Sequence, residues 1–405
     1  MKKRLLFIGI IMNSAGTENS FLSFLNCLDF DKYDVDLILA KNEGLFMPLI
    51  PSQVNIKFMP EYGDLFLLSG KNAVKLMYNT FIKKNPATFF EILPYFIKLI
   101  LNPKKKIKTA IEMFCRMMRK ISPVTEEYDA AVAYWGDRTM FYMIDKVLNA
   151  KKKIAWMHFE YSTPQREPRD DEIYLKYFQK CDNIVNVSTA VDTSLKKKFP
   201  QIAEKFIIIE NIQNADFIRK RSLEGSSFPD SHFKGRRILT VGRITEQKGC
   251  DMIPIILAKL KENNYDVRWY ILGDGEENEK LKLIELAADY NISEMLILLG
   301  TTINPYPFMR DCDIYVQPSR YEGKPLSVEE AKIMRCPIVV ANYLSANEQT
   351  ADGKYGLVAE INPESIYEKI KLLLDDENLR ENLSKTLAKE NFGNESEINK
   401  FYELL

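Results

Sequence analysis

The sequence predicts an α/β protein made of two parallel-sheet domains, and three observations support this prediction. At 405 residues, the chain is too long for a single ordinary hydrophobic core. Short apolar runs alternate with amphipathic helical stretches along the whole chain, which is typical of parallel strands joined by crossover helices. The composition changes after Asn211, and a loop-like Gly, Ser and Pro segment follows at 224–231. We therefore expect one domain at 1–211 and a second at 212–394.

The first domain is expected to contain seven strands. Its start, Met1-Lys2-Lys3-Arg4 followed by an apolar run, superficially resembles a secretory signal peptide. The apolar part is short and lacks a small-residue cleavage site, so a first parallel strand is the better interpretation. The strands are expected at 4–10, 35–40, 55–59, 130–134, 153–157, 183–187 and 206–209. A long helical insert, at about 72–120, interrupts the alternation, with Pro86, Pro94 and Pro103 near its helix boundaries.

The second domain repeats the alternation of apolar runs and helical stretches. Its strands are expected at 238–241, 267–272, 295–299, 313–316, 337–341 and 356–360. Helices are expected between them, at 250–263, 276–291 and 327–335. Asp311-Cys312-Asp313 has the spacing of an Asp-x-Asp metal motif, but it directly precedes an expected strand. We interpret it as a helix end and a strand start, and we predict no metal site.

The composition is that of a globular protein, with 46% hydrophobic and 28% charged residues. The six cysteines include no Cys-x-x-Cys pair and there are only two histidines, which argues against structural zinc. Free thiols in a reducing cytoplasm are the expected state. No apolar run approaches the roughly 20 residues that a membrane-spanning helix needs.

Charge is distributed unevenly, although Lys+Arg and Asp+Glu are equal at 56 each. Residues 71–120 contain twelve Lys or Arg against only Glu91 and Glu112, a formal charge of +10. These cations are mixed with large apolar side chains, and basic amphipathic helices favour anionic membranes. A solvated helix face packed on its own domain explains the pattern equally well. No aromatic stripe of the nucleic-acid-binding kind accompanies the cations, so we predict no nucleic-acid partner.

Two cations follow the first strand of the second domain, in Gly242-Arg243-Ile244-Thr245-Glu246-Gln247-Lys248-Gly249. A helix is expected to begin directly after them, and a helix N-terminus attracts anions. The Arg243 fork and the Lys248 point charge would complete a clamp for a diphosphate. The alternative is a pair of solvated loop cations.

Two carboxylates, Glu322 and Glu330, follow another strand, in the stretch from Gln317 to Ala331. The carboxyl ends of parallel strands are where open α/β sheets bind ligands, and carboxylates suit the hydroxyls of a sugar nucleotide. The alternative for Glu330 is a capping box with Ser327, which would close a helix N-terminus.

Both motifs, the Arg243/Lys248 segment and the pair Glu322-x7-Glu330, resemble those of glycosyltransferase family 4. The resemblance implies the GT-B fold: two Rossmann-like domains facing a central cleft, with a final helix at 395–405 crossing back to the first. It also implies that Arg243 and Lys248 hold the donor phosphates, that Glu322 faces the donor sugar and that Glu330 accepts the ribose hydroxyls. The family loop usually reads Glu-Gly-Phe-Gly-Leu, whereas Pro325 here has no backbone N–H to donate.

The resemblance assigns roles to further residues. It implies that His158, after the strand at 153–157, faces the anomeric carbon as a catalytic group, although a lone His at a strand end is more often structural. Gly16 lies in a turn similar to the family's Gly-Gly-x-Glu turn, where backbone amides approach the donor; a plain strand-to-helix turn is the alternative. The remaining donor-binding residues implied are Gly273, Gly323, Lys324 and Leu326.

The resulting expectation is a retaining, metal-independent transfer from a nucleotide-diphosphate sugar, expected to be a UDP-sugar, to a glycan or lipid-linked acceptor in surface polysaccharide synthesis. No cofactor is needed. The alternatives are a UDP-sugar epimerase of the same fold and a non-catalytic sugar-nucleotide-binding protein. We expect a cytoplasmic protein, placed peripherally on the inner face of the plasma membrane if the insert at 72–120 contacts lipid.

Overall fold

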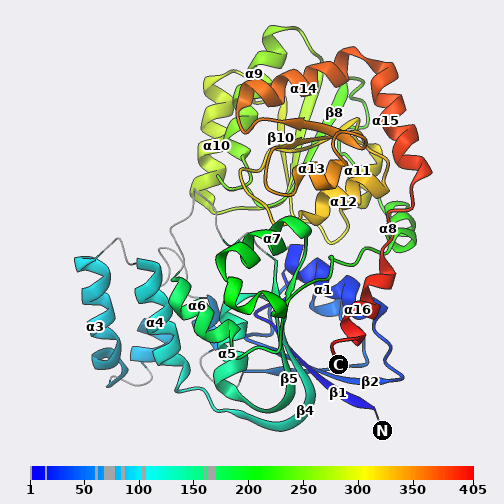
Figure 1. The fold of residues 1–405 in the computed structure, drawn as a ribbon. Helices are drawn as coiled ribbons and strands as arrows, with labels where there is room; N and C mark the ends of the chain where they lie inside the picture. The colour runs from blue at the N-terminus through cyan, green and yellow to red at the C-terminus, as the bar shows by residue number, and fades with distance from the viewer. Residues whose placement is uncertain are drawn as a thin grey trace. The chain divides into compact units, whose positions relative to one another are not determined.

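The computed structural model describes residues 2–13, 16–59, 63–67, 78–83, 87–102, 106–158, 161 and 170–405. The chain divides into two compact units (Figure 1). The first unit comprises 1–13, 24–210 and 398–405, and the second comprises 14–23 and 211–397. The second unit thus includes a short N-terminal segment, and the first includes the end of the chain.

The first unit is built on a parallel seven-stranded sheet with the order β3-β2-β1-β4-β5-β6-β7. In β1, β2 and the C-terminal parts of β4 and β5, consecutive residues are buried on both faces, as expected for a sheet covered by helices on each side. The strands are β1 (Lys3–Ile8), β2 (Tyr33–Leu39), β3 (Val54–Phe58), β4 (Val124–Ala133), β5 (Val147–Met157), β6 (Asn183–Asn186) and β7 (Phe206–Ile208).

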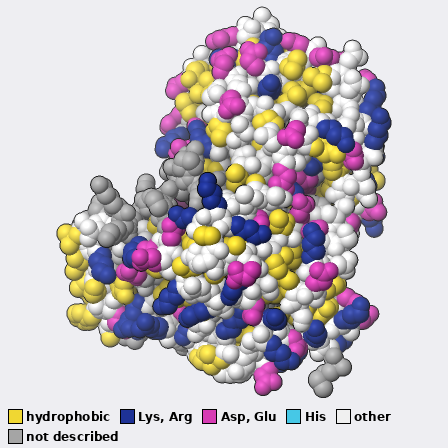
Figure 2. Space-filling model, viewed as in Figure 1, with side chains coloured by type: hydrophobic (Ala, Val, Ile, Leu, Met, Phe, Trp, Pro, Cys, Tyr) yellow, Lys and Arg dark blue, Asp and Glu magenta, His cyan; other side chains and the backbone are white. Residues whose placement is uncertain are grey.

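The helices of the first unit include a pair, α3 (Ala87–Leu101) and α4 (Lys106–Met118), within the predicted insert. The outer face of α3 carries apolar side chains (Figure 2). The other helices are α5 (Asp137–Lys146), α6 (Asp171–Phe178), α7 (Thr189–Lys198), α16 (Ile398–Tyr402) and the C-terminal part of α1 (Gly16–Cys27), with short turns η1 (Met47–Leu49), η2 (Gly63–Leu67), η4 (Tyr78–Ile82) and η6 (Pro200–Lys205).

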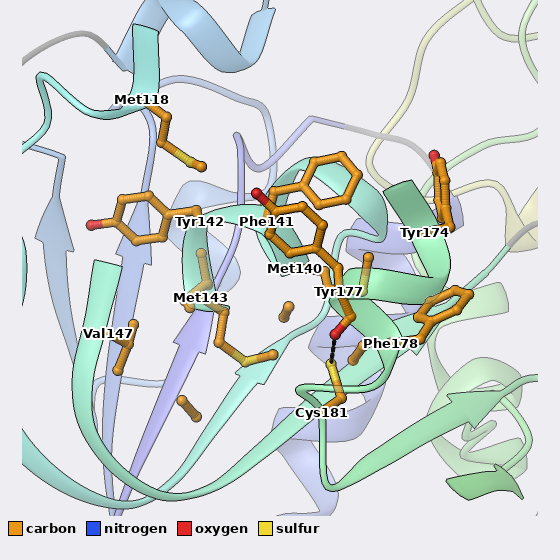
Figure 3. Packing of buried hydrophobic residues seen from close by; sticks show 14 of the residues in the cluster. Met118, Met140, Phe141, Tyr142, Met143, Val147, Tyr174, Tyr177, Phe178 and Cys181 are labelled. Atoms are coloured by element: carbon orange, nitrogen blue, oxygen red, sulfur yellow. Dashed lines mark hydrogen bonds between the residues drawn. The ribbon is translucent and has the colours of Figure 1, made fainter. Parts of the chain in front are cut away.

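Two aromatic-rich layers hold this unit together. On one side, α4, α5 and α6 bring Met118, Phe141 and Tyr177 into one buried cluster (Figure 3). The Cys181 Sγ donates to the Tyr177 carbonyl, at 3.6 Å, at the edge of this cluster. In the second layer, Phe401 of α16 packs edge-on against Phe24, with ring centroids 5.0 Å apart.

The second unit has a parallel six-stranded sheet with the order β10-β9-β8-β11-β12-β13. This is the doubly wound order. Successive strands are added on one side of β8 up to β10 and then on the other side from β11, so the strand order reverses between β8 and β11. The strands are β8 (Arg236–Val241), β9 (Val267–Leu272), β10 (Leu296–Gly300), β11 (Ile314–Gln317), β12 (Ile338–Ala341) and β13 (Gly356–Ala359).

Helices cover both faces of this sheet. Alternate strand residues face opposite layers: Trp269 packs with α9, α10 and α14, whereas Tyr270 packs with α8, α11 and α12. The helices are α8 (Ala215–Ser222), α9 (Ile253–Glu262), α10 (Glu277–Asp289), α11 (Tyr306–Asp311), α12 (Leu326–Ile333), α13 (Ala346–Thr350), α14 (Pro363–Asp375) and α15 (Glu377–Lys389), with the turns η7 (Cys250–Met252) and η8 (Glu395–Glu397).

The predicted α/β class with two parallel sheets is confirmed, and each of the thirteen strands expected from the sequence has a counterpart. The main difference is that β4 and β5 begin about six residues earlier than expected. Their additional residues are largely exposed, so the apolar pattern that reveals a buried strand is missing there.

Candidate functional site

The candidate site lies in the second unit, beyond the carboxyl ends of β8, β9 and β11. These three strands are neighbours in the sheet, and the reversal of strand order lies between β8 and β11. The loop after β8 carries Arg243 and Lys248, and the loop after β11 carries Glu322. Open α/β sheets bind ligands at such a reversal point, so the topology itself brings the predicted residues together.

Two glycines allow the loops to approach this closely. Gly249 has φ +70°, and a Cβ at this position would lie 2.1 Å from the Pro318 carbonyl oxygen. Gly273, after β9, has φ +156°, and a Cβ there would lie 1.9 Å from the Gly242 carbonyl oxygen. A side chain would force the three loops apart at both positions. Gly273 thus supports the loop that carries Arg243 and Lys248.

Lys248 and Glu322 form an ion pair at the centre of the site. The Lys248 Nζ lies 2.5 Å from the Glu322 Oε1, and both side chains are mostly buried. A partly buried pair of this kind is sensitive to the loss of one partner, because the other charge is then left without compensation. The two predicted motifs are therefore physically coupled, because one of the two cations is held by one of the two carboxylates.

A chain of polar side chains from β11 fixes the Glu322 carboxylate. The Ser319 hydroxyl donates to Oε1 at 2.7 Å, and the Gln317 amide approaches the same oxygen at 3.4 Å. The Gln317 Oε1 in turn accepts from the Tyr315 hydroxyl at 2.7 Å, which fixes the orientation of the amide. These contacts and that of Lys248 all converge on Oε1. Among the described residues no hydrogen bond reaches Oε2, so this oxygen can accept a ligand hydroxyl.

Glu330 lies on α12 and is almost fully buried, at 3% exposure. Its Oε1 accepts from the Asn19 amide at 2.6 Å and from the Tyr306 hydroxyl at 3.3 Å. Asn19 belongs to the N-terminal segment of the second unit. Burial raises the pKa of Glu330 to about 7, against the lowering effect of these two donors. The carboxyl group is thus poised to change charge near neutral pH.

The capping-box alternative for Glu330 is wrong. Helix α12 begins at Leu326 with Pro325 as its N-cap, so Ser327 lies inside the first turn. The Ser327 hydroxyl donates to the Gln317 Oε1 at 3.3 Å. Ser327 therefore supports the Glu322 network, and Glu330 does not close the helix end.

Arg243 contrasts with Lys248. Its side chain is exposed, and it makes no ion pair with any residue that the structure describes. The guanidinium therefore has its fork of donors available for an anionic ligand. Of the other donor-binding candidates, Gly323 and Leu326 are buried, and the Lys324 Nζ lies 3.3 Å from the Glu348 Oε1.

His158 and Gly16 were also predicted at the site. His158 directly follows β5 in the first unit, where its ring lies 4.7 Å from the Tyr134 ring and 6.3 Å from the Trp156 ring. Gly16 is the first residue of α1 in the second unit, and a Cβ there would meet nothing within 4 Å. Packing around Gly16 therefore does not require a glycine.

The Asp311-Cys312-Asp313 segment lies where α11 ends and β11 begins. The Asp313 carboxylate accepts from the Arg236 guanidinium and the Arg237 backbone, both at 2.8 Å. Asp311 pairs with Arg310 at 2.6 Å. Among the described residues, no group of three or more His, Cys, Asp and Glu is arranged to hold a metal ion. Asp313 thus fixes the start of β11, the strand that presents Glu322.

Comparison with known proteins identifies the domain that contains this site. Residues 228–390, which include Arg243, Lys248, Glu322 and Glu330, match the family model described as glycosyl transferases group 1. The site therefore lies in the part of the chain that is similar to these glycosyltransferases. Helices of the described residues are all too short or too polar to cross a membrane.

Two relatives show how far the likeness extends. The chain is 30% identical over 217 residues to the Campylobacter jejuni N-acetylgalactosamine-N,N'-diacetylbacillosaminyl-diphospho-undecaprenol 4-alpha-N-acetylgalactosaminyltransferase. That match covers 52% of this chain, and the chain spans just 57% of the relative. A second match, 26% identical over 411 residues and 100% of both chains, is an uncharacterized glycosyltransferase of Haemophilus influenzae.

Solved structures extend the likeness of the fold to the whole chain. The crystal structure of a TarM mutant from S. aureus, in complex with UDP and two further ligands, has a TM-score of 0.70 at 14% identity, and the match covers 99% of each chain. HepE of Anabaena in complex with UDP has a TM-score of 0.65 at 15% identity and covers 100% of this chain and 99% of its own. The two parallel-sheet units and these neighbours confirm the GT-B fold.

Proposed function

We propose that the protein is a retaining glycosyltransferase of family 4 that moves a sugar from a UDP-sugar to a glycan or lipid-linked acceptor in polysaccharide synthesis. The observation that carries this proposal is the ion pair between Glu322 and Lys248, at the reversal point of the second sheet. Lys248 lies in the same loop as Arg243. The Campylobacter relative, whose acceptor is by its name linked to undecaprenol diphosphate, supports a lipid-linked acceptor.

In the proposed reaction, Arg243 and Lys248 stabilise the diphosphate as it gains negative charge on departure. The bond between the anomeric carbon and the diphosphate oxygen breaks, while the acceptor oxygen bonds to that carbon from the same face. The acceptor proton passes to an oxygen of the departing phosphate. No metal ion and no cofactor are required, because the two cations supply the positive charge.

The carboxylates position the donor. Glu322 is held through Oε1 by Ser319 and Lys248, so its Oε2 is the oxygen that would accept a sugar hydroxyl. Glu330 would accept the ribose hydroxyls, replacing a contact with Asn19 or Tyr306. A preformed network of this kind reduces the ordering that donor binding must impose.

The proposal is tested by measuring UDP release from a panel of UDP-sugars. Arg243→Ala and Lys248→Ala should each lower turnover by roughly 10²-fold, which is typical of removing one donor to developing charge. Lys282→Ala, at an exposed position of α10, is the matched control and should retain full turnover. Near-normal turnover in the Arg243/Lys248 double variant would overturn the proposal.

A further inference from the structure

Helix α3 of the first unit is apolar on two opposite faces. One face is directed inward: Ile92 is fully buried in the core, and Thr88 on the same side is also buried. A helix at the surface of a globular protein normally carries polar residues opposite its buried face. In α3 this rule is broken.

The outer face of α3 is a stripe of four apolar residues, Phe90, Pro94, Ile97 and Leu101, which we call the outer stripe. At about 100° per residue these positions fall within about 60° of one another. Phe90 is 73% exposed, Leu101 70% and Ile97 47%. Figure 2 shows this patch of apolar side chains over α3. Contiguous exposed apolar surface of this kind marks an interaction site.

The neighbouring helix α4 provides an internal comparison. It buries Met113, Phe114 and Met117 in the same core, while the partly exposed side chains of Lys108 and Glu112 lie on the opposite side of the helix. α4 is therefore an ordinary amphipathic helix. The outer stripe is thus a property of α3 and not of the insert as a whole.

The segment that contains the stripe, residues 71–120, is positively charged. Both acidic residues of 71–120 are bound by cations, Glu91 by Lys120 at 2.7 Å and Glu112 by Lys98 at 3.4 Å. Lys83 and Arg119 are exposed and form no ion pair with the residues that the structure describes. With a formal charge of +10 over the segment, the surface complements an anionic partner.

The lysine cluster at 104–108 is a less suitable source of this charge than the sequence suggested. Lys104 and Lys105 lie outside the described residues, as does the side chain of Lys106. The Lys108 Nζ is 2.7 Å from the Asp170 Oδ2, so this cation is already paired within the protein. The apolar stripe, and not the lysine cluster, is the distinguishing feature.

We propose that the outer stripe of α3 inserts into the interface of an anionic lipid membrane, with Lys83 and Arg119 contacting its headgroups. Apolar side chains on a helix that lies in the membrane plane bury into the boundary between headgroups and acyl chains. Nearby cations add attraction to anionic lipids. This inference goes beyond the transfer reaction, because it rests on α3 alone.

The test is sedimentation of the full-length protein with vesicles of phosphatidylglycerol and phosphatidylcholine in equal parts, compared with vesicles of phosphatidylcholine alone. The triple variant Phe90→Ser/Ile97→Ser/Leu101→Ser should bind the mixed vesicles at least roughly 100-fold more weakly than the wild type. Lys83→Glu/Arg119→Glu should weaken binding to the mixed vesicles by roughly tenfold or more and leave binding to phosphatidylcholine unchanged.

The matched control is Leu281→Ser/Ile284→Ser on α10. It removes two exposed apolar side chains, whose exposures of 49% and 51% are close to the 47% of Ile97. This control should bind vesicles as the wild type does. UDP release without vesicles should stay unchanged in the triple variant, because Arg243, Lys248, Glu322 and Glu330 lie in the second unit. This readout separates a failure of the membrane proposal from a failure of the proposed reaction and detects misfolding.

Three results would overturn the proposal: vesicle binding that survives in the triple variant, equal binding to both kinds of vesicle, or no binding by the wild type. A change from dimer to monomer in the triple variant, with no vesicle binding by the wild type, would show that a second copy of the chain covers the stripe.

Discussion

Replacing Glu330 by Gln should make the second unit more stable at high pH. Burial raises the pKa of Glu330 from its usual 4.5 to about 7 in the folded protein. Each pKa unit corresponds to about 1.36 kcal/mol, so ionising this carboxyl in place costs up to about 3 kcal/mol. The glutamine side chain would keep an acceptor oxygen for Asn19 and Tyr306 but carry no charge.

The sign follows from proton binding. The folded protein holds the Glu330 proton up to about pH 7, whereas the unfolded chain releases it near pH 4.5. The stabilising contribution is therefore complete below pH 4.5 and is lost as the pH rises to about 7. Between pH 5.5 and pH 8, the advantage of Glu330→Gln over the wild type should grow by about 2 kcal/mol.

Glu329 provides a matched control on the adjacent position. Burial alone would raise the pKa of Glu329, but the positive charges of Lys332 and Lys324 outweigh it and the pKa is lowered. The Lys332 Nζ lies 2.7 Å from its Oε2. Glu329→Gln should therefore destabilise the unit, with the loss present at neutral pH and disappearing as the pH falls through the acid range.

The assay is native-state hydrogen exchange of the amides in α12 and β11, since a chain of two units need not unfold in one transition. Comparing variant with wild type at each pH removes the dependence of intrinsic exchange on pH. Protection that is lower in Glu330→Gln than in the wild type at pH 8 would refute the reasoning. So would a difference between the two proteins that does not change with pH.

Three further predictions concern the candidate site. Lys248→Ala should lower the free energy of unfolding by about 1–3 kcal/mol, because the buried Glu322 carboxylate then lacks a compensating positive charge. Arg243→Ala should leave the free energy of unfolding nearly unchanged, and urea denaturation of both variants measures the difference. If the ionised Glu330 holds the ribose, UDP-sugar affinity should fall roughly tenfold between pH 8 and pH 6 in calorimetric titrations, and Glu330→Gln should lose this dependence. Sugar transfer should continue in the presence of EDTA. If EDTA abolished transfer and added Mg²⁺ or Mn²⁺ restored it, the metal-independent reaction would be contradicted.

Much of the fold could be predicted because buried parallel strands are short apolar runs, and these are visible in the sequence. The early starts of β4 and β5 escaped prediction for the converse reason. β5 begins with residues such as Asn149 and Lys152, which are exposed and polar, and only pairing with β4 makes them a strand. Local sequence does not reveal such pairing.

The site also contains some residues that could be predicted from the sequence and others that could not. Arg243, Lys248 and Glu322 were predictable because each follows a recognisable strand, and the strand order then brings them together. Asn19 and Tyr306 were missed as partners of Glu330, since they lie 311 and 24 residues away from it in the chain. Gln317 and Ser319 stood within the motif itself, yet their support of Glu322 depends on side-chain geometry that spacing does not show.

Calorimetric titration of UDP onto the wild type, Arg243→Ala and Lys248→Ala tests the central claim most directly. The account predicts saturable binding to the wild type. It predicts affinity lower by roughly 10- to 100-fold in each variant, as expected for losing a hydrogen bond to a charged group, and unchanged affinity in Lys282→Ala. Wild-type affinity in both Arg243→Ala and Lys248→Ala would contradict the claim that these two cations hold the donor diphosphate.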